Sequence, residues 1–181
     1  MSEPQTNTPQ YSLAYLDAEL SVLVRRFIAT RARCRRACRV IAHAGDGLVC
    51  MVALAAIALF VPLARVIVAR MLVASLLAAA LVGLGKLAFR RPRPIPDERH
   101  QWSSLGEHDE YAFPSGHAAR TASIAAAACQ ASSSLGAAAW GWSIAVSLCR
   151  VALGAHYGAD VIIGMLVGAL SAWIVRMLGW P

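Results

Sequence analysis

The chain has 181 residues, of which 58% are hydrophobic and only 15% are charged, with a formal net charge of +7 at pH 7. A soluble domain of this length would carry more charge, so the composition favours an integral membrane protein. The basic balance does not indicate nucleic-acid binding, because seven arginines crowd into residues 25–39, beside the first apolar run. Basic residues in that position set orientation and contact anionic lipid.

The first part of the chain is polar or basic. Residues 1–12 are polar and contain proline, and we expect a disordered tail. Apolar or small residues then recur at helical spacing while most arginines fall off that stripe, which predicts a basic amphipathic helix within residues 13–46. Such a helix would lie along the membrane surface, and packing against the helical core is an equally good interpretation. His43 and Asp46, which precede the first apolar run, are expected to act as local caps.

Five apolar stretches follow, each close to the ~20 residues that a membrane helix needs. They cover residues 47–63, 71–89, 118–133, 135–153 and 161–178. Pro62 and the segment from Arg65 to Arg70 are expected to form the first turn between them. Residues 47–181 are therefore predicted to form one membrane-embedded domain. The fold class that we expect is all-α, an integral membrane helical bundle with about five transmembrane helices plus an N-terminal amphipathic helix.

Five crossings place the basic N-terminal segment and the loops at 90–113 and 154–160 on one side of the membrane. The positive-inside rule then predicts that this side is cytoplasmic, in a multi-pass protein of the cell (inner) membrane. If the N-terminal helix itself crosses the membrane, the N-terminus changes sides and the charge evidence becomes ambiguous.

Three polar clusters fall where apolar stretches give way to loops. Charge at a membrane edge is energetically expensive, so each cluster needs an explanation. For Lys86 or Arg93 alone, a side chain that extends to the membrane interface would be a sufficient one. Together the clusters supply cations, a hydroxyl, a glycine amide, two imidazoles and a carboxylate. This set suits a phosphate group that is held by positive charge and attacked by histidine. The clusters are Lys86 with Arg93-Pro94, Pro114-Ser115-Gly116-His117, and Arg150 with His156 and Asp160.

Two of these clusters also have a local structural interpretation. Ser115 fits the N-cap of a helix, whose first free amides form an anion site, and a plain cap with an incidental histidine is the alternative. His156 and Asp160 would lie one turn apart on one face if both enter the last helix. A carboxylate that accepts a hydrogen bond from one ring nitrogen leaves the other nitrogen with a lone pair for attack.

The ordered series Lys86-x6-Arg93-Pro94, Pro114-Ser115-Gly116-His117 and Arg150-x5-His156-x3-Asp160 resembles the motifs of the type 2 phosphatidic acid phosphatases. These are membrane members of a superfamily that includes bacterial acid phosphatases and vanadium haloperoxidases. The resemblance covers residues 45–180, approximately. Two departures are visible: Cys149 stands where the family usually has serine, and five clear spans are found where six are usual.

The resemblance implies a role for each motif residue. His156 is expected to be the nucleophile, oriented by Asp160, while His117 protonates the leaving oxygen and then activates water. Three fixed cations can stabilise the transferred phosphoryl group without a metal or other cofactor. The residues expected to hold its equatorial oxygens are Lys86, Arg93, Ser115, Gly116 and Arg150.

The sequence thus predicts a metal-independent membrane phosphatase that removes the terminal phosphate of a phosphorylated lipid through a phosphohistidine. The candidate substrates are phosphatidic acid, phosphatidylglycerophosphate and polyprenyl phosphates or diphosphates, and the expected partners are this lipid and the bilayer. The alternatives are a vanadate-dependent oxidant of the same superfamily and a non-catalytic lipid-phosphate-binding membrane protein. Arg120, three residues after His117, is either a fourth phosphate or headgroup contact or the partner of a loop acid. The oligomeric state is not predicted.

Overall fold

The computed structural model describes residues 13–94 and 111–179, so the tail predicted at 1–12 lies outside the described residues. The described residues form seven α-helices and one short 3-10 helix, with no strand, which confirms the all-α prediction. The elements are α1 (Leu13–Ala29), α2 (Ala32–His43), α3 (Gly47–Phe60), η1 (Pro62–Ala64), α4 (Arg65–Phe89), α5 (Gly116–Ala128), α6 (Ser133–Ala152) and α7 (Gly158–Met177).

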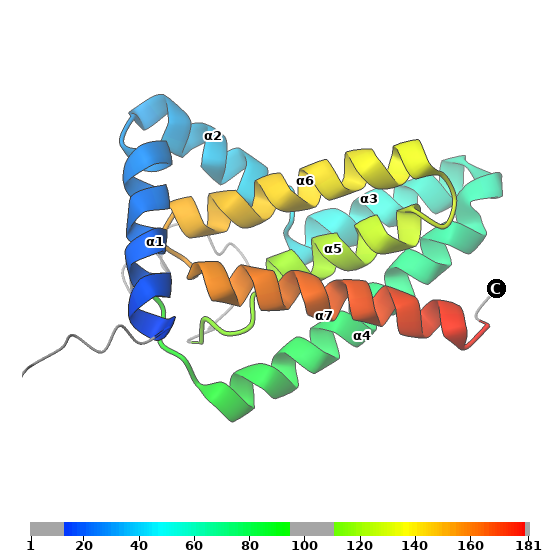
Figure 1. Cartoon of the computed structure of the whole chain (residues 1–181). Helices are drawn as coiled ribbons and strands as arrows, with labels where there is room; N and C mark the ends of the chain where they lie inside the picture. The colour runs from blue at the N-terminus through cyan, green and yellow to red at the C-terminus, as the bar shows by residue number, and fades with distance from the viewer. Residues whose placement is uncertain (1–12, 95–110, 180–181) are drawn as a thin grey trace, which may run out of the picture.

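Helices α3 to α7 run lengthwise in alternating directions, and α1 crosses one end of the bundle (Figure 1). Helix α5 lies at the centre and packs against α4, α6 and α7. Its buried face consists mostly of small side chains such as Ala118, Ala119 and Ala122, which let neighbouring backbones approach closely. The approach is closest at Gly168 of α7, where a Cβ atom would overlap the carbonyl oxygen of Ala119.

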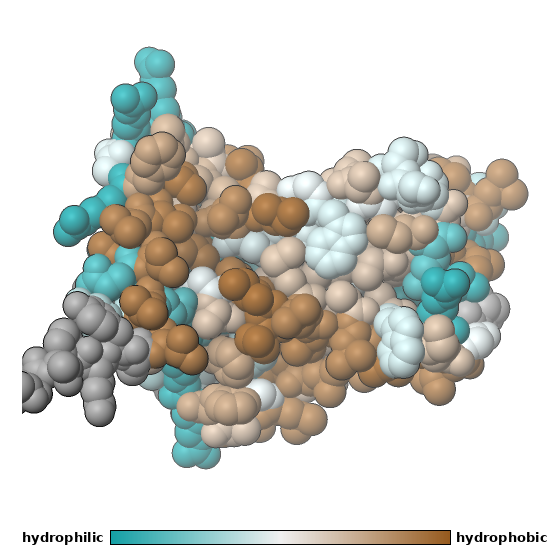
Figure 2. Space-filling view, viewed as in Figure 1, coloured by the Kyte–Doolittle hydropathy of each residue, from teal (hydrophilic) through white to brown (hydrophobic). Residues whose placement is uncertain are grey.

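The bundle has the surface of a membrane protein. Within the described residues, three stretches are long and apolar enough to cross a membrane, namely 62–89, 133–152 and 158–177, and a fourth span results if α2 and α3, bent by 57°, are counted together. Apolar side chains cover the middle of the face shown in Figure 2, and hydrophilic ones gather towards its two ends. The chain is an integral membrane protein.

The predicted spans at 47–63 and 118–133 are shorter in the structure than the sequence pattern indicates. Helix α3 has 14 residues and α5 has 13, so neither is long enough to count as a span by itself. Helix α5 ends at Ala128 because a turn over residues 129–132 leads directly into α6. It is buried among other helices along most of its length, so its apolar composition reflects burial in protein.

The first turn of the bundle lies earlier than predicted. The segment from Arg65 to Arg70 is helical, and α4 runs for 25 residues from Arg65. The chain reverses instead at η1, where Pro62 occupies a first-turn position that needs no amide hydrogen. The Arg65 side chain reaches back across this turn, where its Nε donates to the carbonyl oxygen of Ala58 in α3 at 3.0 Å.

The predicted N-terminal helix is divided into two, with a break at residues 30–31. Helix α2 packs on α6, and α1 contacts both α6 and α7. Buried Cys38 and Ala42 of α2 meet Cys149 and Ala152 of α6 in a small core. The outward side of α1 nevertheless exposes large apolar residues, and Phe27 is 91% exposed. The two helices therefore pack on the bundle with one side and present apolar and basic residues with the other.

Candidate active site

The three predicted clusters meet at one end of the bundle. Helices α4 and α6 end there, and α5 and α7 begin there (Figure 1). A pocket of about 380 Å³ opens between these ends. Six of the eight predicted site residues line it: Lys86, Arg93, Gly116, His117, Arg150 and His156. The other two, Ser115 and Asp160, are fully buried and do not line the pocket.

The backbone after α4 brings Arg93 to this pocket. Arg90 ends the helix in the left-handed conformation, with φ of 46°. The following segment then pairs with the chain that leads into α5, through a bridge between Pro92 and Tyr111. Arg93 Nη1 donates to the carbonyl oxygen of Ala155 at 3.3 Å, which ties the first cluster to the loop before α7.

His156 lies in the loop just before α7, and its side chain is only 1% exposed. Its Nδ1 lies 2.8 Å from the carbonyl oxygen of Ala112. A carbonyl oxygen can only accept, so Nδ1 carries the proton and Nε2 holds the lone pair. Asp160 Oδ2 is 3.7 Å from the same nitrogen, too far for the hydrogen bond predicted from the sequence. A backbone carbonyl therefore fixes the tautomer of this ring.

The His156 imidazole is neutral at ordinary pH. Burial lowers the pKa of His156 well below its usual value, and the positive charges of Arg150, Arg93 and Lys86 lower it further. A cationic ring has no lone pair to offer, so these surroundings keep the ring in its nucleophilic form.

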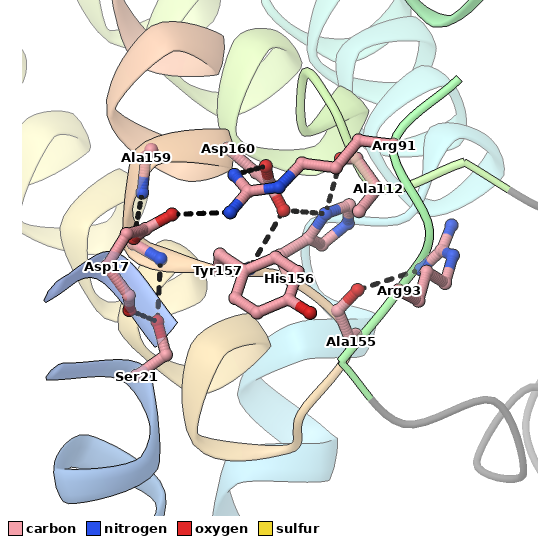
Figure 3. A network of polar contacts seen from close by, with 11 residues as sticks. Asp17, Ser21, Arg91, Arg93, Ala112, Ala155, His156, Tyr157, Ala159 and Asp160 are labelled. Atoms are coloured by element: carbon pink, nitrogen blue, oxygen red, sulfur yellow. Dashed lines mark hydrogen bonds and ion pairs between the residues drawn. The ribbon is translucent and has the colours of Figure 1, made fainter. Parts of the chain in front are cut away.

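Asp160 makes its hydrogen bonds with the backbone and an arginine, and its contact with the His156 ring is a longer one of 3.7 Å (Figure 3). Its Oδ2 accepts the amide hydrogen of Tyr157 at 2.8 Å, and its Oδ1 accepts from Arg91 Nη1 at 2.8 Å. Its own carbonyl oxygen accepts from the amide of Ser115 at 2.9 Å, which joins the second cluster to the third. The carboxylate thus secures the start of α7 and the segment that follows α4.

Helix α1 completes this network (Figure 3). Asp17 Oδ2 accepts from Arg91 Nη2 at 2.7 Å, and Asp17 Oδ1 accepts the amide hydrogen of Ala159 at 2.9 Å. Ser21 Oγ accepts from the amide of Gly158 at 3.0 Å. Two of the free amides at the start of α7 are therefore satisfied by side chains of the N-terminal helix.

Sequence reasoning missed Arg91 and Asp17. Arg91 sits beside the motif arginine in a basic run, and nothing in its spacing distinguishes it. Burial opposes the charge of Arg91, but its bonds to Asp17 and Asp160 outweigh burial and raise its pKa. The only available signal for Asp17 was its rarity, as one of three acids among residues 13–46.

His117 is held by Asp46, a second contact that the sequence did not indicate. Asp46 Oδ1 lies 2.6 Å from His117 Nε2, and Asp46 Oδ2 lies 2.6 Å from His43 Nδ1. Burial alone would raise the pKa of Asp46, but the bonds from these two imidazoles hold it at about 2. Asp46 occupies the N-cap position of α3 without any side-chain capping bond, so the expected capping role is wrong for its carboxylate.

Cys149, the residue that departs from the family pattern, faces away from the pocket. It is buried in the contact between α2 and α6, beside Cys38, and does not line the pocket. The substitution therefore changes the packing of α2 and leaves the pocket wall unaltered.

Two solved structures share this fold. The crystal structure of Aquifex aeolicus LpxE aligns with a TM-score of 0.73 and 23% identity, over 90% of this chain and 95% of that one. The transmembrane PAP2 type phosphatidylglycerolphosphate phosphatase from Bacillus subtilis aligns with a TM-score of 0.72 and 19% identity, over 92% of this chain and 85% of that one. No curated protein matches the sequence. Residues 67–180, which hold all three clusters, match the PAP2 superfamily, and the chain therefore belongs to that superfamily.

Proposed function

We propose that this protein is a lipid phosphate phosphatase that uses His156 as its nucleophile and needs no metal. The observation that carries the proposal is the buried, neutral His156 ring at a pocket that is also lined by Lys86, Arg93 and Arg150. Phosphoryl transfer depends mainly on positioning and charge stabilisation, which three fixed cations provide. The Bacillus protein of similar fold is named for a phosphorylated lipid, which supports the same substrate class here.

In the first step, His156 Nε2 donates its lone pair to phosphorus while the bond from phosphorus to the leaving oxygen breaks. The electron pair of that bond stays on the oxygen, and His117 supplies the proton that neutralises it. Lys86, Arg93 and Arg150 hold the equatorial oxygens. The Ser115 hydroxyl does not line the pocket, but it is buried next to Gly116 of the pocket wall without a hydrogen-bond partner among the described residues, so it is a further candidate donor to the same group.

In the second step, water hydrolyses the phosphohistidine. His117, now neutral, takes a proton from water as the oxygen attacks phosphorus. The bond between phosphorus and nitrogen breaks, and its electrons return to His156 Nε2. The Asp160 carboxylate, 3.7 Å from Nδ1, stabilises the cationic ring of the intermediate.

The pocket position suits a lipid whose headgroup is phosphorylated. The polar residues gather where the apolar helices end, and Ala79, Val82 and Gly83 of α4 form an apolar wall beside the cations. A headgroup can enter this pocket while its acyl or prenyl chains remain in the bilayer. We place the active end on the cytoplasmic side of the cell membrane, because the arginine-rich α2 and the two arginines near the end of α1 lie at that end.

The deciding experiment is an assay of purified protein in detergent with EDTA. The substrates are phosphatidic acid, phosphatidylglycerophosphate and prenyl mono- and diphosphates. We expect phosphate release from at least one lipid, and a loss of more than about 10⁴-fold in the His156→Ala variant. The matched control is Arg176→Ala at the opposite end of α7, which should retain activity.

Other results would overturn the proposal. No release from any lipid, or release only with added metal, contradicts it. Tight binding of a lipid phosphate without turnover indicates a non-catalytic binder. Halide oxidation that depends on peroxide and added vanadate indicates the haloperoxidase chemistry of the superfamily.

A further inference from the structure

Arg120 is a fourth cation in the pocket, beyond the three of the motifs. It lies three residues after His117 on α5, so the two side chains share one face of the helix. Its guanidinium lines the pocket together with Lys86, Arg93 and Arg150. The loop acids considered as partners from the sequence alone lie outside the described residues, and Arg120 donates a hydrogen bond to the backbone.

The Arg120 side chain is fixed by the backbone that leads into α3. Its Nη1 donates to the carbonyl oxygen of Gly45 at 3.2 Å. The guanidinium also packs against Gly47, where an added Cβ would lie 3.2 Å from the Arg120 Cζ atom. A long side chain that is held in this way loses little conformational entropy when it binds a ligand, so Arg120 is preorganised to bind an anion.

Arg120 belongs to the side of the pocket where the leaving group departs. Arg120 follows His117 by three positions on α5, and its Nη1 donates to Gly45, the residue next to the Asp46 that holds the His117 ring. Arg150 acts on both imidazoles, whereas Arg120 is among the cations that act on His117. In-line displacement puts the leaving oxygen opposite the nucleophile, next to the acid that protonates it. Arg120 therefore lies beyond the bond that breaks, one helical turn deeper in α5 than His117.

The charge of the pocket exceeds the need of one phosphate. Four cations line it, and no carboxylate is among the described residues that do. A phosphate monoester carries a charge of about −1.5 to −2 at pH 7, which the three motif cations already balance. A fourth cation on the leaving side therefore fits a substrate that carries a second phosphate group.

We propose that Arg120 binds a second phosphate group on the leaving side, and that the preferred substrate is a lipid diphosphate. This inference rests on the proposed function. His156 attacks the terminal phosphorus, the bond to the bridging oxygen breaks, and the lipid monophosphate leaves with that electron pair and the His117 proton. Arg120 holds the inner phosphate and stabilises the negative charge that develops there.

The test compares two lipids that differ by a single phosphate. Farnesyl diphosphate and farnesyl monophosphate are assayed with the full-length protein and with Arg120→Gln. We expect the variant to lose about 10- to 100-fold in kcat/KM for the diphosphate and less than about 3-fold for the monophosphate. Inorganic diphosphate should inhibit the variant about 10-fold less well than the wild type, while inhibition by inorganic phosphate should not change.

Retained monophosphate turnover shows that the variant is folded. Arg176→Gln, on the exposed side of α7 at the opposite end, is the matched control and should treat both lipids like the wild type. Phosphatidylglycerophosphate paired with phosphatidic acid forms a second arm. If Arg120→Gln loses activity only towards phosphatidylglycerophosphate, the group that Arg120 binds is the phosphodiester of that headgroup and not the inner phosphate of a diphosphate.

Two outcomes overturn the inference while the proposed function stands. In the first, Arg120→Gln lowers turnover of both members of each pair equally. In the second, the wild type hydrolyses monophosphates and is no more sensitive to inorganic diphosphate than to phosphate. Failure of the wild type to hydrolyse any of the four lipids is a different result, because it contradicts the proposed function itself.

Discussion

In the proposed mechanism His117 acts as an acid, and Asp46 is the residue that favours the protonated form of its ring. Burial and the positive charges of Arg150 and Arg120 lower the pKa of His117 to about 3, and the bond to Asp46 opposes this shift. The only carboxylate in contact with this ring among the described residues belongs to Asp46, at 2.6 Å. His43 contacts the other oxygen of the same carboxylate.

Replacing Asp46 by asparagine keeps the size of the side chain and removes its charge. We expect kcat to fall by about 10- to 100-fold, a part of the ~10²–10⁴-fold typical of acid–base groups. The alkaline limb of the kcat/KM profile should move to lower pH, because the protonated His117 loses its counter-charge. A pH–rate series checks this, with His43→Gln as the milder comparison, and an unchanged profile in Asp46→Asn would contradict the role.

Burial of a neutral histidine also makes the stability of the fold depend on pH. The pKa of His156 is lowered in the folded state, so between that lowered value and about 6.5 only the unfolded chain takes up the proton. Its contribution is complete above pH ~6.5 and is lost by up to about 1.4 kcal/mol for each pH unit as the pH falls below it.

The change in thermal stability between about pH 7.5 and about pH 5 should therefore be smaller in His156→Gln than in the wild type. Differential scanning fluorimetry in detergent measures the four melting temperatures. Equal losses in the two proteins would show that other groups govern acid sensitivity.

At the scale of elements, the contact between α5 and α7 depends on the absence of a side chain at Gly168. A Cβ there would overlap the Ala119 carbonyl oxygen and approach the Ser123 backbone nitrogen to 2.9 Å. Alanine usually stabilises a helix relative to glycine by up to ~1 kcal/mol. A loss of stability in Gly168→Ala would therefore mean that the steric clash outweighs this gain.

We expect Gly168→Ala to lower stability by about 1–3 kcal/mol, because overpacking forces the two helices apart. Gly141→Ala in α6 is the control, since no atom lies within 4 Å of a Cβ at that position. Melting temperatures of the two variants in one detergent decide the matter. A drop of equal size in both would refute the close-packing argument.

Helix α1 supports the loop that holds His156 through its contact with the first turn of α7. Asp17 is only 14% exposed and binds both Arg91 and the amide of Ala159. Replacing it by asparagine removes the charge that Arg91 needs and leaves that guanidinium half-satisfied. The stability should fall by about 1–3 kcal/mol, with a parallel loss of kcat because Asp160 shares the same arginine.

Glu19→Gln on the exposed side of α1 provides the matched control for Asp17→Asn. Thermal melts and lipid phosphatase assays of the two variants give both readouts. Wild-type values for Asp17→Asn would mean that α1 is only an attachment to the bundle.

For the whole molecule, α3 to α7 run between the two ends of the bundle in alternating directions (Figure 1), and we expect these ends to face opposite sides of the membrane. Leu63, in the turn before α4, is 98% exposed at the end remote from the pocket. Arg90 is exposed at the pocket end. Single cysteines at these two positions therefore report the orientation of the enzyme.

In a background with the native cysteines replaced by serine, an impermeant maleimide added to intact cells should label Leu63→Cys and spare Arg90→Cys. Labelling of both after lysis shows that each site is reactive. The reverse pattern in intact cells would put the active end outside the cytoplasm.

The class of the protein and most of its site could be read from the sequence. Hydrophobic composition indicates the membrane, because water excludes apolar surface wherever it lies in the chain. The motif residues could be chosen because polar groups at span ends are costly and because their ordered series resembles that of a known family. Their meeting at one pocket followed from the alternating spans, which place the ends of α4 and α6 beside the starts of α5 and α7.

Tertiary packing alone decided what surrounds those residues. The carbonyl of Ala112 on His156, the carboxylate of Asp46 on His117, and Asp17 on Arg91 join positions between 44 and 74 apart. No local period encodes such contacts, since they depend on how helices cross and where loops return. The same cause explains the shortness of α5: its apolar run is matched to neighbouring helices, and a sequence cannot distinguish burial in protein from burial in lipid.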